Sequence, residues 1–316
     1  MAKCDIPIHP QQVPQVMNVN GLSLRVDTLY CDAKGREKKR LRKQAEATLE
    51  RLREPLQRLL GTDECILFVA RGSRSLTALE QITAGWATYR YALFDLVLTN
   101  RRLLQFGVDP NGKWKKSLKS LAWGDVGSAK IKAGLLGKEF SLLLQNRSKL
   151  RYWRLGGPQA NALRTIIPAV LAASIGEVTG HALRQLCPGC LRDLAPGQYQ
   201  CSGCGMSFKD EQTLKRRAII IPGGGYFYVN QTFMGVVAAI VDVYLLFLLA
   251  VALLDSRVVK SSEADNPIAQ AVGVAVFVVF LISVEKTLEI YHARQAVRDF
   301  IPVEGAGAMR SAAGMS

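Results

Sequence analysis

Two long apolar stretches near the C-terminus constrain this chain more than any other feature. The first, residues 233–254, is a run of 22 residues in which Asp242 is the only acid or base, and the second, residues 267–284, has no charged residue. At about 1.5 Å per helical residue, each can cross or nearly cross a hydrocarbon layer about 30 Å thick. A water-exposed helix of this length would keep a polar face, and neither stretch has one. The sequence therefore predicts a hairpin of two membrane helices, the alternative being a buried helical pair in a large soluble core.

The distribution of charge predicts which way this hairpin faces. Of the 41 Lys and Arg residues, 35 precede residue 218, whereas the polar segment between the two stretches has only two basic residues among three acidic ones. The basic residues next to the first stretch are Lys215, Arg216 and Arg217. The positive-inside rule then places residues 1–217 and the tail 285–316 in the cytoplasm, with both termini inside an inner or plasma membrane. Because no apolar stretch occurs in the first 60 residues, we expect no cleaved signal peptide.

The basic surplus also narrows the class of partner. A net charge of +15 is compatible with nucleic acid or with an anionic membrane surface. Each basic residue close to the cytoplasmic leaflet gains about 1 kcal/mol, so with a membrane hairpin present anionic lipid headgroups are the simpler explanation. We therefore expect binding to anionic lipid and to a protein partner, and no binding to nucleic acid.

The N-terminal region divides into an arm and a helix. Residues 1–35 show no sustained period and predict either short strands or a loose arm. Residues 36–61 predict a basic amphipathic helix, because leucines recur at spacings of three and four between many lysines and arginines. Pro55 is expected to kink or interrupt it. The helix could dock on the next domain or pair in a coiled coil, lie on the membrane, or act as a nucleic-acid arm.

Residues 62–175 change to the periodicity of strands. The predicted strands cover residues 65–70, 92–106 with a turn around Asn100, 117–123, 126–133, 140–145 and 150–155. Gly157 and Pro158 then begin a helix with Leu163 and Ile167 on its apolar side. Antiparallel strands closed by one C-terminal helix predict an α+β fold, either a β-sandwich or a partly open barrel.

Two short motifs in this region carry a resemblance. They are Leu98-Thr99-Asn100-Arg101-Arg102-Leu103 and Leu121-Ala122-Trp123-Gly124-Asp125-Val126. With this order of elements, residues 62–175 resemble the bacterial pleckstrin-homology-like and GRAM-like domains. The resemblance implies a pleckstrin-homology-like sandwich with lipid-binding, peptide-binding or scaffolding roles, without the Lys/Arg pattern of inositide-specific members. Thr99, Asn100 and Arg101 are interpreted as fold residues, since Asn tolerates a left-handed turn and an arginine can hold carbonyls or a carboxylate.

A loop within this region suggests lipid binding. The residues concerned are Lys113, Trp114, Lys115 and Lys116, which follow the turn residues 109–112. A tryptophan between lysines suits a membrane interface, where the ring lies among headgroups and the ammonium groups meet anionic lipid. The alternative is that Trp114 folds back on the sheet and the lysines are merely solvated.

Four of the seven cysteines form the most specific motif. Cys187-Pro-Gly-Cys190 and Cys201-Ser-Gly-Cys204 are two CxxC knuckles separated by ten residues, a spacing that can bring four thiolates to one tetrahedral Zn²⁺. Residues 180–210 resemble a zinc ribbon, although Leu191 stands where a glycine often follows the first knuckle. Because protein fills all four positions, we expect a structural zinc site. A pair of redox dithiols is disfavoured, since that chemistry belongs at a helix start in a βαβ context.

The segment that precedes the first apolar stretch carries a third resemblance. It reads Ile219-Ile220-Ile221-Pro222-Gly223-Gly224-Gly225-Tyr226-Phe227-Tyr228. This is similar to the start of small two-helix membrane modules of the TM2 type, which implies a transmembrane hairpin within residues 218–284. Tyr226 and Tyr228 are expected at headgroup depth.

Asp242 shares one face of the first predicted helix with two small residues, Gly235 and Ala239. Small residues at this spacing permit close helix approach, so a homo-oligomer could form through this face. Asp242 lies about 13 Å past the inner end of the helix, where an ionised carboxylate is costly. We expect it to be protonated or hydrogen-bonded inside the hairpin or an oligomer. An ion or proton path is the alternative, and two helices alone are too few to enclose one.

No set of residues typical of catalysis is apparent. The three histidines are isolated, and no paired carboxylates or Ser/His/Asp set stand out. The sequence therefore predicts a non-enzymatic membrane adaptor or scaffold that presents a pleckstrin-homology-like domain and a zinc ribbon at the cytoplasmic face. The competing classes are a membrane-tethered nucleic-acid-binding protein and a small oligomeric channel or transporter that uses Asp242.

Overall fold

The computed structural model describes residues 4, 6–8, 13–134, 137–174, 183–258 and 267–303. The chain divides into two compact units. Met1–Met206 with Ala306–Ser316 is called the sheet unit below, and Ser207–Gly305 is called the helical unit. Most of the polar segment predicted between the two apolar stretches lies outside the described residues, as do the end of the predicted tail and the start of the predicted ribbon.

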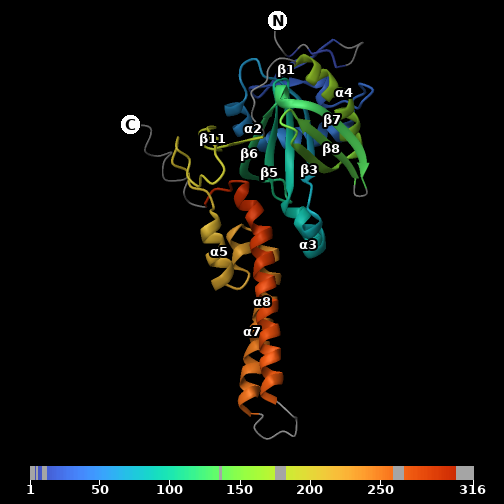
Figure 1. Ribbon diagram of the computed structural model, residues 1–316. Coiled ribbons are helices and arrows are strands. Elements are labelled where there is room, and N and C mark those ends of the chain that lie inside the picture. Colours follow the sequence, from blue (N-terminus) through green and yellow to red (C-terminus); the bar gives the residue numbers. More distant parts are fainter. Residues whose placement is uncertain are drawn as a thin grey trace. The chain divides into compact units, whose positions relative to one another are not determined.

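One large sheet organises the sheet unit (Figure 1). Among the described residues it has eleven strands, in the order β11-β10-β6-β5-β4-β3-β9-β8-β7, with β2 beside β3 and β1 beside β2. The pairs are antiparallel except for β2 with β3. The strands are β1 (Val16–Val19), β2 (Leu22–Arg25), β3 (Ile66–Arg74), β4 (Leu93–Thr99), β5 (Arg102–Val108), β6 (Trp114–Ala122), β7 (Val126–Gly134), β8 (Gly137–Leu144), β9 (Lys149–Leu155), β10 (Arg184–Leu186) and β11 (Asp193–Leu194).

The mixed α+β class and the C-terminal helix are confirmed. α4 (Gly157–Ala173) begins where predicted, with Pro158 in its first turn. α3 (Ala78–Tyr91), between β3 and β4, was not predicted, because its Leu79 and Ile82 are exposed and leave no clear apolar stripe. A capping box gives the missing signal: Thr77 N–H donates to Glu80 Oε2 at 2.8 Å and Glu80 N–H to Thr77 Oγ1 at 3.2 Å.

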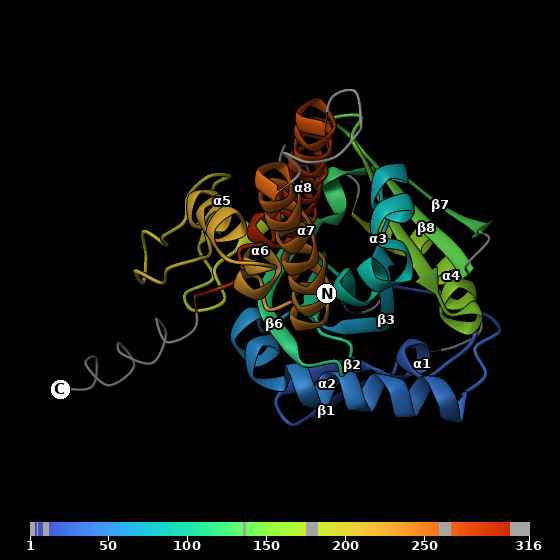
Figure 2. The ribbon, with the colours of Figure 1, turned by 90° about the horizontal axis from the view of Figure 1, so that it is seen from below.

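The central strands are buried on both faces. In β4, Leu96 and Leu98 belong to one apolar cluster and Val97 to the other, as the period of two along a strand requires. Helix α4 covers the first cluster with Leu163, Ile166, Ile167 and Val170. Helix α2 (Lys39–Leu59) covers the second with Leu49, Leu52, Leu56 and Leu59, and lies beside β2 in Figure 2.

Helix α2 therefore docks on the neighbouring sheet, which favours the first of the alternatives left open for it. Of the two effects expected of Pro55, an interruption is wrong: the helix runs from Lys39 to Leu59 without a break, with Pro55 buried inside it, and a kink stays a prediction. Several arginines of α2 pair with carboxylates one turn away, namely Arg42 with Glu46, Arg53 with Glu50 and Arg58 with Glu54. Three of its seven basic residues are thus paired on the helix itself.

The N-terminal arm is anchored by a buried ion pair. β1, β2 and the short α1 (Val26–Leu29) occupy part of the segment predicted as strands or a loose arm. Arg25 is 1% exposed and holds Asp27 with two hydrogen bonds of 2.8 and 2.6 Å. Burial by itself would raise the pKa of Asp27, but the bonds from Arg25 and from Gln15 N–H hold it below its ordinary value. Arg25 also donates to the carbonyls of Cys4 and Ile6, so this side chain joins the start of the chain to β2.

Four helices make up the described part of the helical unit. They are α5 (Glu211–Ile220), α6 (Gly224–Tyr228), α7 (Thr232–Val258) and α8 (Pro267–Arg298). α7 and α8 pack side by side (Figure 1), and α5 and α6 pack together and against α8. Asp210 caps α5 through a 2.7 Å bond from Thr213 N–H, and Pro222 follows its end.

Among the described helices, one is long and apolar enough to cross a membrane. It covers Thr232–Leu254, has a mean hydropathy of 2.8, and is only 17% buried over its most apolar window. α8 begins at the predicted residue, Pro267, but continues to Arg298, and its second half carries Glu285, Lys286 and Glu289. The second membrane span and the hairpin therefore stay predictions.

Candidate metal centre and two buried polar networks

The four predicted cysteine ligands come together in the sheet unit. One sulfur from each of Cys187, Cys190, Cys201 and Cys204 lies within 4.8 Å of all the others. The Sγ atoms of Cys187 and Cys204 are 3.5 Å apart, and those of Cys190 and Cys201 are 3.4 Å apart. Sulfurs about 2.3 Å from a tetrahedral Zn²⁺ would be separated by nearly these distances. The donor set fits a structural zinc ion.

The two knuckles repeat one backbone pattern. Leu191 N–H donates to Cys187 carbonyl at 2.9 Å, and Gly205 N–H donates to Cys201 carbonyl at the same distance. Leu191 and Gly205 also share a left-handed conformation, with φ of 63° and 70°. A leucine is strained there and a glycine is not. The departure noticed at Leu191 thus keeps the geometry of the knuckle at some energetic cost.

The small residues of the knuckles make room for the sulfurs. A Cβ on Gly203 would lie 2.6 Å from Arg192 Cδ and 3.0 Å from Cys190 Sγ, so no larger residue fits without movement. Gly203 N–H also points to Cys201 Sγ at 3.4 Å. Burial raises the pKa of the Cys201 thiol, but the N–H groups of Cys204 and Gly203, together with the Cys190 and Cys187 thiols, lower it to about 7. These N–H groups favour the thiolate form that zinc requires.

The ribbon continues the edge of the large sheet. β10 leads into the first knuckle and pairs with β6, with Gln185 opposite Lys119 and Leu186 opposite Leu118. Leu186 belongs to the same apolar cluster as α2. A metal ion at the four cysteines would therefore stabilise an outer part of the sheet.

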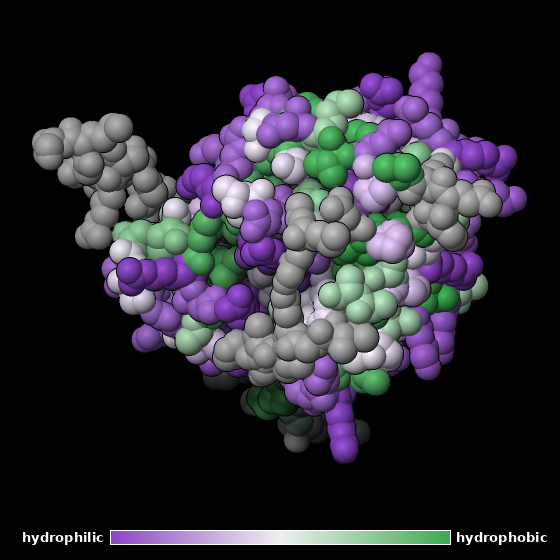
Figure 3. Space-filling model, turned by 90° about the horizontal axis from the view of Figure 1, so that it is seen from above, coloured by the Kyte–Doolittle hydropathy of each residue, from purple (hydrophilic) through white to green (hydrophobic). Residues whose placement is uncertain are grey.

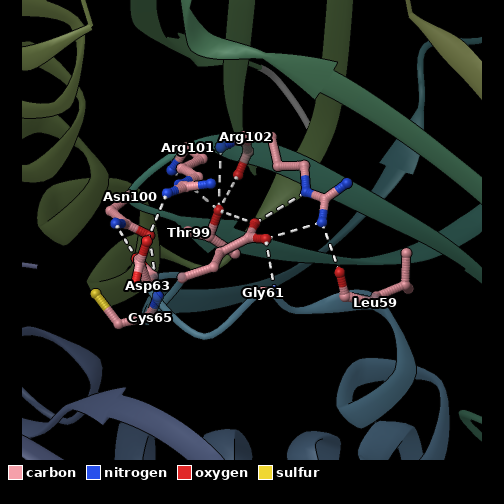
Figure 4. Close-up of polar contacts among 9 residues, drawn as sticks. Leu59, Gly61, Asp63, Cys65, Thr99, Asn100, Arg101 and Arg102 are labelled. Carbon is pink, nitrogen blue, oxygen red and sulfur yellow. Dashed lines mark hydrogen bonds and ion pairs between the residues drawn. The ribbon is translucent and has the colours of Figure 1, made fainter. Parts of the chain in front are cut away.

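The polar residues of the first resemblance motif tie loops to the sheet (Figure 4). Buried Glu64 receives hydrogen bonds from Thr99 Oγ1 at 2.7 Å and from Arg102 at 2.9 and 2.8 Å. Arg102 also donates to Leu59 carbonyl at 2.7 Å, at the end of α2. This network joins the segment between α2 and β3 to the turn between β4 and β5, so Thr99 is a fold residue as predicted.

Asn100 and Arg101 have roles close to those expected, with one difference. Asn100 is not in a left-handed conformation; its side chain accepts from Cys65 N–H at 2.9 Å and donates to Asp63 carbonyl at 3.0 Å (Figure 4). Arg101 holds the exposed Asp63 carboxylate at 3.3 Å. Trp123, from the second motif, donates through Nε1 to Thr99 carbonyl at 2.8 Å. The two motifs that carry the resemblance are therefore in direct contact.

The loop predicted to bind lipid is partly built into the sheet. Trp114 starts β6, packs edge-on against Phe106 with ring centroids 5.8 Å apart, and donates to Ser117 carbonyl at 3.0 Å. This placement favours the alternative in which the indole folds back. Lys115 donates to Tyr91 carbonyl at 2.9 Å, whereas Lys113 and Lys116 are exposed. Lipid binding by this loop stays a prediction, and it would rest on these two exposed lysines.

A group of charged side chains is buried where α7 and α8 meet, and is called the charge cluster below. It consists of Asp242, Glu285, Lys286 and Glu289. Lys286 Nζ lies 2.5 Å from Asp242 Oδ2, 2.9 Å from Glu289 Oε2 and 3.4 Å from Glu285 Oε2. Asp242 is 3% exposed and Glu289 is 1% exposed. The hydrogen-bonded state expected for Asp242 is thus formed within one chain.

The turn before α6 completes this network with backbone N–H groups. Gly223 N–H donates to Asp242 Oδ2 at 2.9 Å, and Gly225 N–H donates to Glu289 Oε1 at 2.7 Å. A Cβ on Gly223, whose φ is +64°, would clash with the Gly235 carbonyl oxygen and lie 3.1 Å from Ala239 nitrogen. The face of α7 that carries Gly235, Ala239 and Asp242 therefore packs against this turn of the same chain.

The residues predicted at the membrane interface fall into two groups. Lys215, Arg216 and Arg217 are exposed on α5. Tyr226 and Tyr228 are buried inside the helical unit, at 5% and 8% exposure. Tyr226 hydroxyl bonds His292 Nδ1 at 2.9 Å, and Tyr228 hydroxyl donates to Asp210 Oδ2 at 3.3 Å. The tyrosines thus fill the core of the unit, and the basic triplet alone keeps the exposure that the prediction required.

Comparisons of the chain with protein-family models, with curated proteins and with solved structures find no match. The resemblances to pleckstrin-homology-like domains, zinc ribbons and TM2-type modules therefore rest on the motifs and geometry described above.

Proposed function

We propose that this chain is an integral membrane protein that carries a zinc-stabilised sheet domain and acts by binding lipid and protein partners, without catalysis. The exposed apolar surface of α7 carries this proposal. Ile240, Phe247 and Leu254 are 65%, 63% and 61% exposed. Soluble proteins rarely expose contiguous apolar patches larger than a few hundred Å². On the face that Figure 3 shows, by contrast, hydrophilic side chains predominate between smaller hydrophobic patches.

The first half of α8 supports a second span. Val276, Phe277 and Phe280 are 64%, 59% and 59% exposed, so the apolar surface of α7 has a counterpart on its neighbour. Two such helices side by side would form the TM2-like hairpin. The charge distribution then favours cytoplasmic termini at an inner or plasma membrane.

The topology has a direct test in labelling. A cysteine at Ser261 should react with an impermeant thiol reagent added to intact cells, and one at Ser311 should not. Reaction at Ser311 alone would reverse the orientation and place the sheet unit outside.

The order of strands supports a pleckstrin-homology-like sheet domain. β3 to β6 form four successive antiparallel strands, β7 to β9 form three more, and α4 closes the domain. In this proposal the zinc ribbon is a rigid structural extension of the sheet through β10 and β6. Its partner is a protein, with anionic lipid as a secondary contact through Lys113 and Lys116.

The lipid contact is tested by measuring how the sheet unit of the full chain binds to added vesicles. Reconstituted protein with Lys113→Gln and Lys116→Gln should lose the preference of the sheet unit for phosphatidylserine-rich over neutral vesicles at low salt. Trp114→Ala serves as the contrasting variant, since its ring packs on Phe106 and should affect stability more than lipid binding. An unchanged preference in the lysine variant would assign lipid binding elsewhere.

The two competing classes are less well supported. A channel or transporter that uses Asp242 needs this carboxylate to face a path, whereas Asp242 is 3% exposed and bonded to Lys286 and Gly223. A nucleic-acid arm would need an unopposed basic face on α2, and several of its arginines pair with neighbouring glutamates. The exposed apolar surface of α7 is common to all three readings, so it does not separate them.

Membrane extraction tests the central part of the proposal. The full chain should stay with membranes after alkaline carbonate treatment and dissolve only in detergent. Replacing Ile240, Val243 and Phe247 together with lysine should release it, because each lysine at the centre of a span costs about 3 kcal/mol. Leu143→Lys on β8, at another exposed apolar position, is the matched control and should change nothing. Release of the wild-type chain by carbonate would contradict the proposal.

A further inference from the structure

Two buried carboxylate oxygens of the charge cluster accept no hydrogen bond within the described part of the chain. They are Asp242 Oδ1 and Glu285 Oε2. Asp242 is 3% exposed, which leaves its unpartnered oxygen away from solvent. One carboxylate oxygen of each group lies within 4.8 Å of the other, but two carboxylates can only accept. A hydrogen bond between them requires one proton.

The remaining donors around the cluster are engaged with other carboxylate oxygens. Glu289 Oε1 accepts from Gly225 and Tyr226 N–H groups, and Glu289 Oε2 accepts from Lys286. Lys286 approaches Glu285 Oε2 at 3.4 Å, an ion pair without hydrogen-bond geometry. Three carboxylates against one ammonium group leave an excess of two negative charges when all are ionised. Burial disfavours this excess of negative charge, because the repulsion between like charges is poorly screened away from water.

Among the described residues, Lys286 is the cation that forms ion pairs with Asp242 and Glu285. On α8, His292 faces Tyr226 hydroxyl of α6, and on α5, Arg217 lies over the ring of Tyr228 at 5.1 Å. The next titratable group on α7, Tyr244, is 59% exposed. Lys286 is thus the cation that the described ion pairs bring to the cluster, and it already serves three carboxylates.

We propose that Asp242 and Glu285 together bind one proton near neutral pH, held as an O–H···O hydrogen bond between Asp242 Oδ1 and Glu285 Oε2. The proton comes from the solvent, converts one carboxylate to a carboxylic acid, and leaves the other as acceptor. This reduces the excess negative charge of the cluster by one. The bond joins α7 to α8 at the position where Gly223 N–H already ties the preceding turn to Asp242. Its loss at alkaline pH leaves two facing carboxylates and weakens this junction.

Infrared difference spectroscopy of the purified full chain in detergent tests the proposal. Near neutral pH the wild type should show the carbonyl stretch of a buried protonated carboxyl group, which disappears when the pH is raised. The band should be absent in Glu285→Gln and in Asp242→Asn. Glu211→Gln is the matched control, since Glu211 forms an exposed ion pair with Arg294 in the same unit, and it should keep the band.

The conservative variant separates proton binding from a simple loss of fold. The amide group that Glu285→Gln introduces can donate to Asp242 Oδ1 without a titratable proton, so this variant should melt at the wild-type temperature near neutral pH and lose the alkaline decrease. Three results would overturn the proposal: a folded wild type without the band, a band that persists in both cluster variants, or a band removed by Mg²⁺ or Ca²⁺ at constant pH. The last would show that the pair binds a cation instead.

Discussion

The two units of this chain differ in what their central contacts bury and in what they expose. In the sheet unit the centre of the sheet is apolar on both faces, and α2 carries its charges outward. In the helical unit the contact between α7 and α8 contains three carboxylates and a lysine, while Ile240 and Phe247 face outward. The same rule explains both, since each unit hides what its solvent does not accept. The proposed function accounts for this difference with water around the first unit and lipid around part of the second.

Buried acids are also neutralised in different ways. In the sheet unit several are held by arginines, as in Asp95 with Arg71 and Glu64 with Arg102, both through two hydrogen bonds. In the helical unit one lysine serves three carboxylates. The first arrangement is locally neutral, and the second is not. For this reason we propose a bound proton for the charge cluster and for none of the described arginine pairs.

Loss of the zinc ligands should have the largest effect. One zinc per chain is expected by metal analysis, and Cys187→Ser or Cys204→Ser should lose it. The loss of stability should be large, because zinc binding contributes about 10 kcal/mol to the fold of such a site. The ribbon, with β10 and β11, should unfold while the helical unit keeps its structure. Hydrogen exchange of both units would measure this. A metal-free wild type with four reactive thiols at these positions would contradict the zinc assignment.

Removal of the shared lysine tests the second arrangement. Lys286→Met leaves three carboxylates without their cation, and should lower the free energy of unfolding of the helical unit by about 3–5 kcal/mol. Arg294→Met removes one partner of an exposed pair with Glu211 and should cost less than about 1 kcal/mol. Thermal melts in detergent compare the two. Equal effects would mean that the cluster is not a buried electrostatic network.

Acid should weaken the arginine pairs of the sheet unit. The pKa of Asp27 is lowered in the folded chain, so its contribution is complete above its unfolded pKa of about 3.9 and is lost as the pH falls below that value. Asp27→Asn should therefore cost about 2 kcal/mol near neutral pH and progressively less in acid. Denaturant melts of both proteins across this range measure the difference. A cost that is constant with pH would show that the ionised Asp27 carboxylate does not stabilise the fold.

The smallest expected effect compares the two knuckles. Leu191→Gly should stabilise the metal-loaded chain by up to about 1 kcal/mol, because a glycine removes the strain of the left-handed position. Gly205→Ala at the equivalent position should destabilise it by a similar amount. Chelator competition reports both. Opposite signs are required; a shared sign would show that the knuckles are not equivalent.

Local patterns in the sequence predicted most of the sheet unit. Each strand from β3 to β9 and helix α4 followed from periodicity and turn residues, and the CxxC spacing predicted the four ligands. For α3, which has no clear apolar stripe, the local signal is the capping box of Thr77 and Glu80. The burial of Trp114 was left as an open alternative, because lysines on both sides of it suit a sheet edge as well as a membrane interface.

The charge cluster could not be predicted in the same way. Lys286 is 44 residues from Asp242, and on sequence alone it resembles any basic residue that flanks a membrane span. Its pairing depends on how far α7 and α8 are offset along each other. The burial of Tyr226 has the same origin, because it follows from α6 packing against α8. Tertiary packing determines both, and no local period records it.

Solvent accessibility along α7 tests most directly whether its exposed apolar side chains face lipid. Nitroxide labels at Ile240, Phe247 and Leu254 in the full chain, reconstituted in lipid, should be reached by oxygen and not by a water-soluble nickel complex, because these side chains face hydrocarbon. A label at Leu143 on β8, also exposed, should show the reverse preference. If the α7 labels were as open to the nickel complex as Leu143, the exposed apolar surface would face water or another protein, and membrane integration through α7 would be wrong.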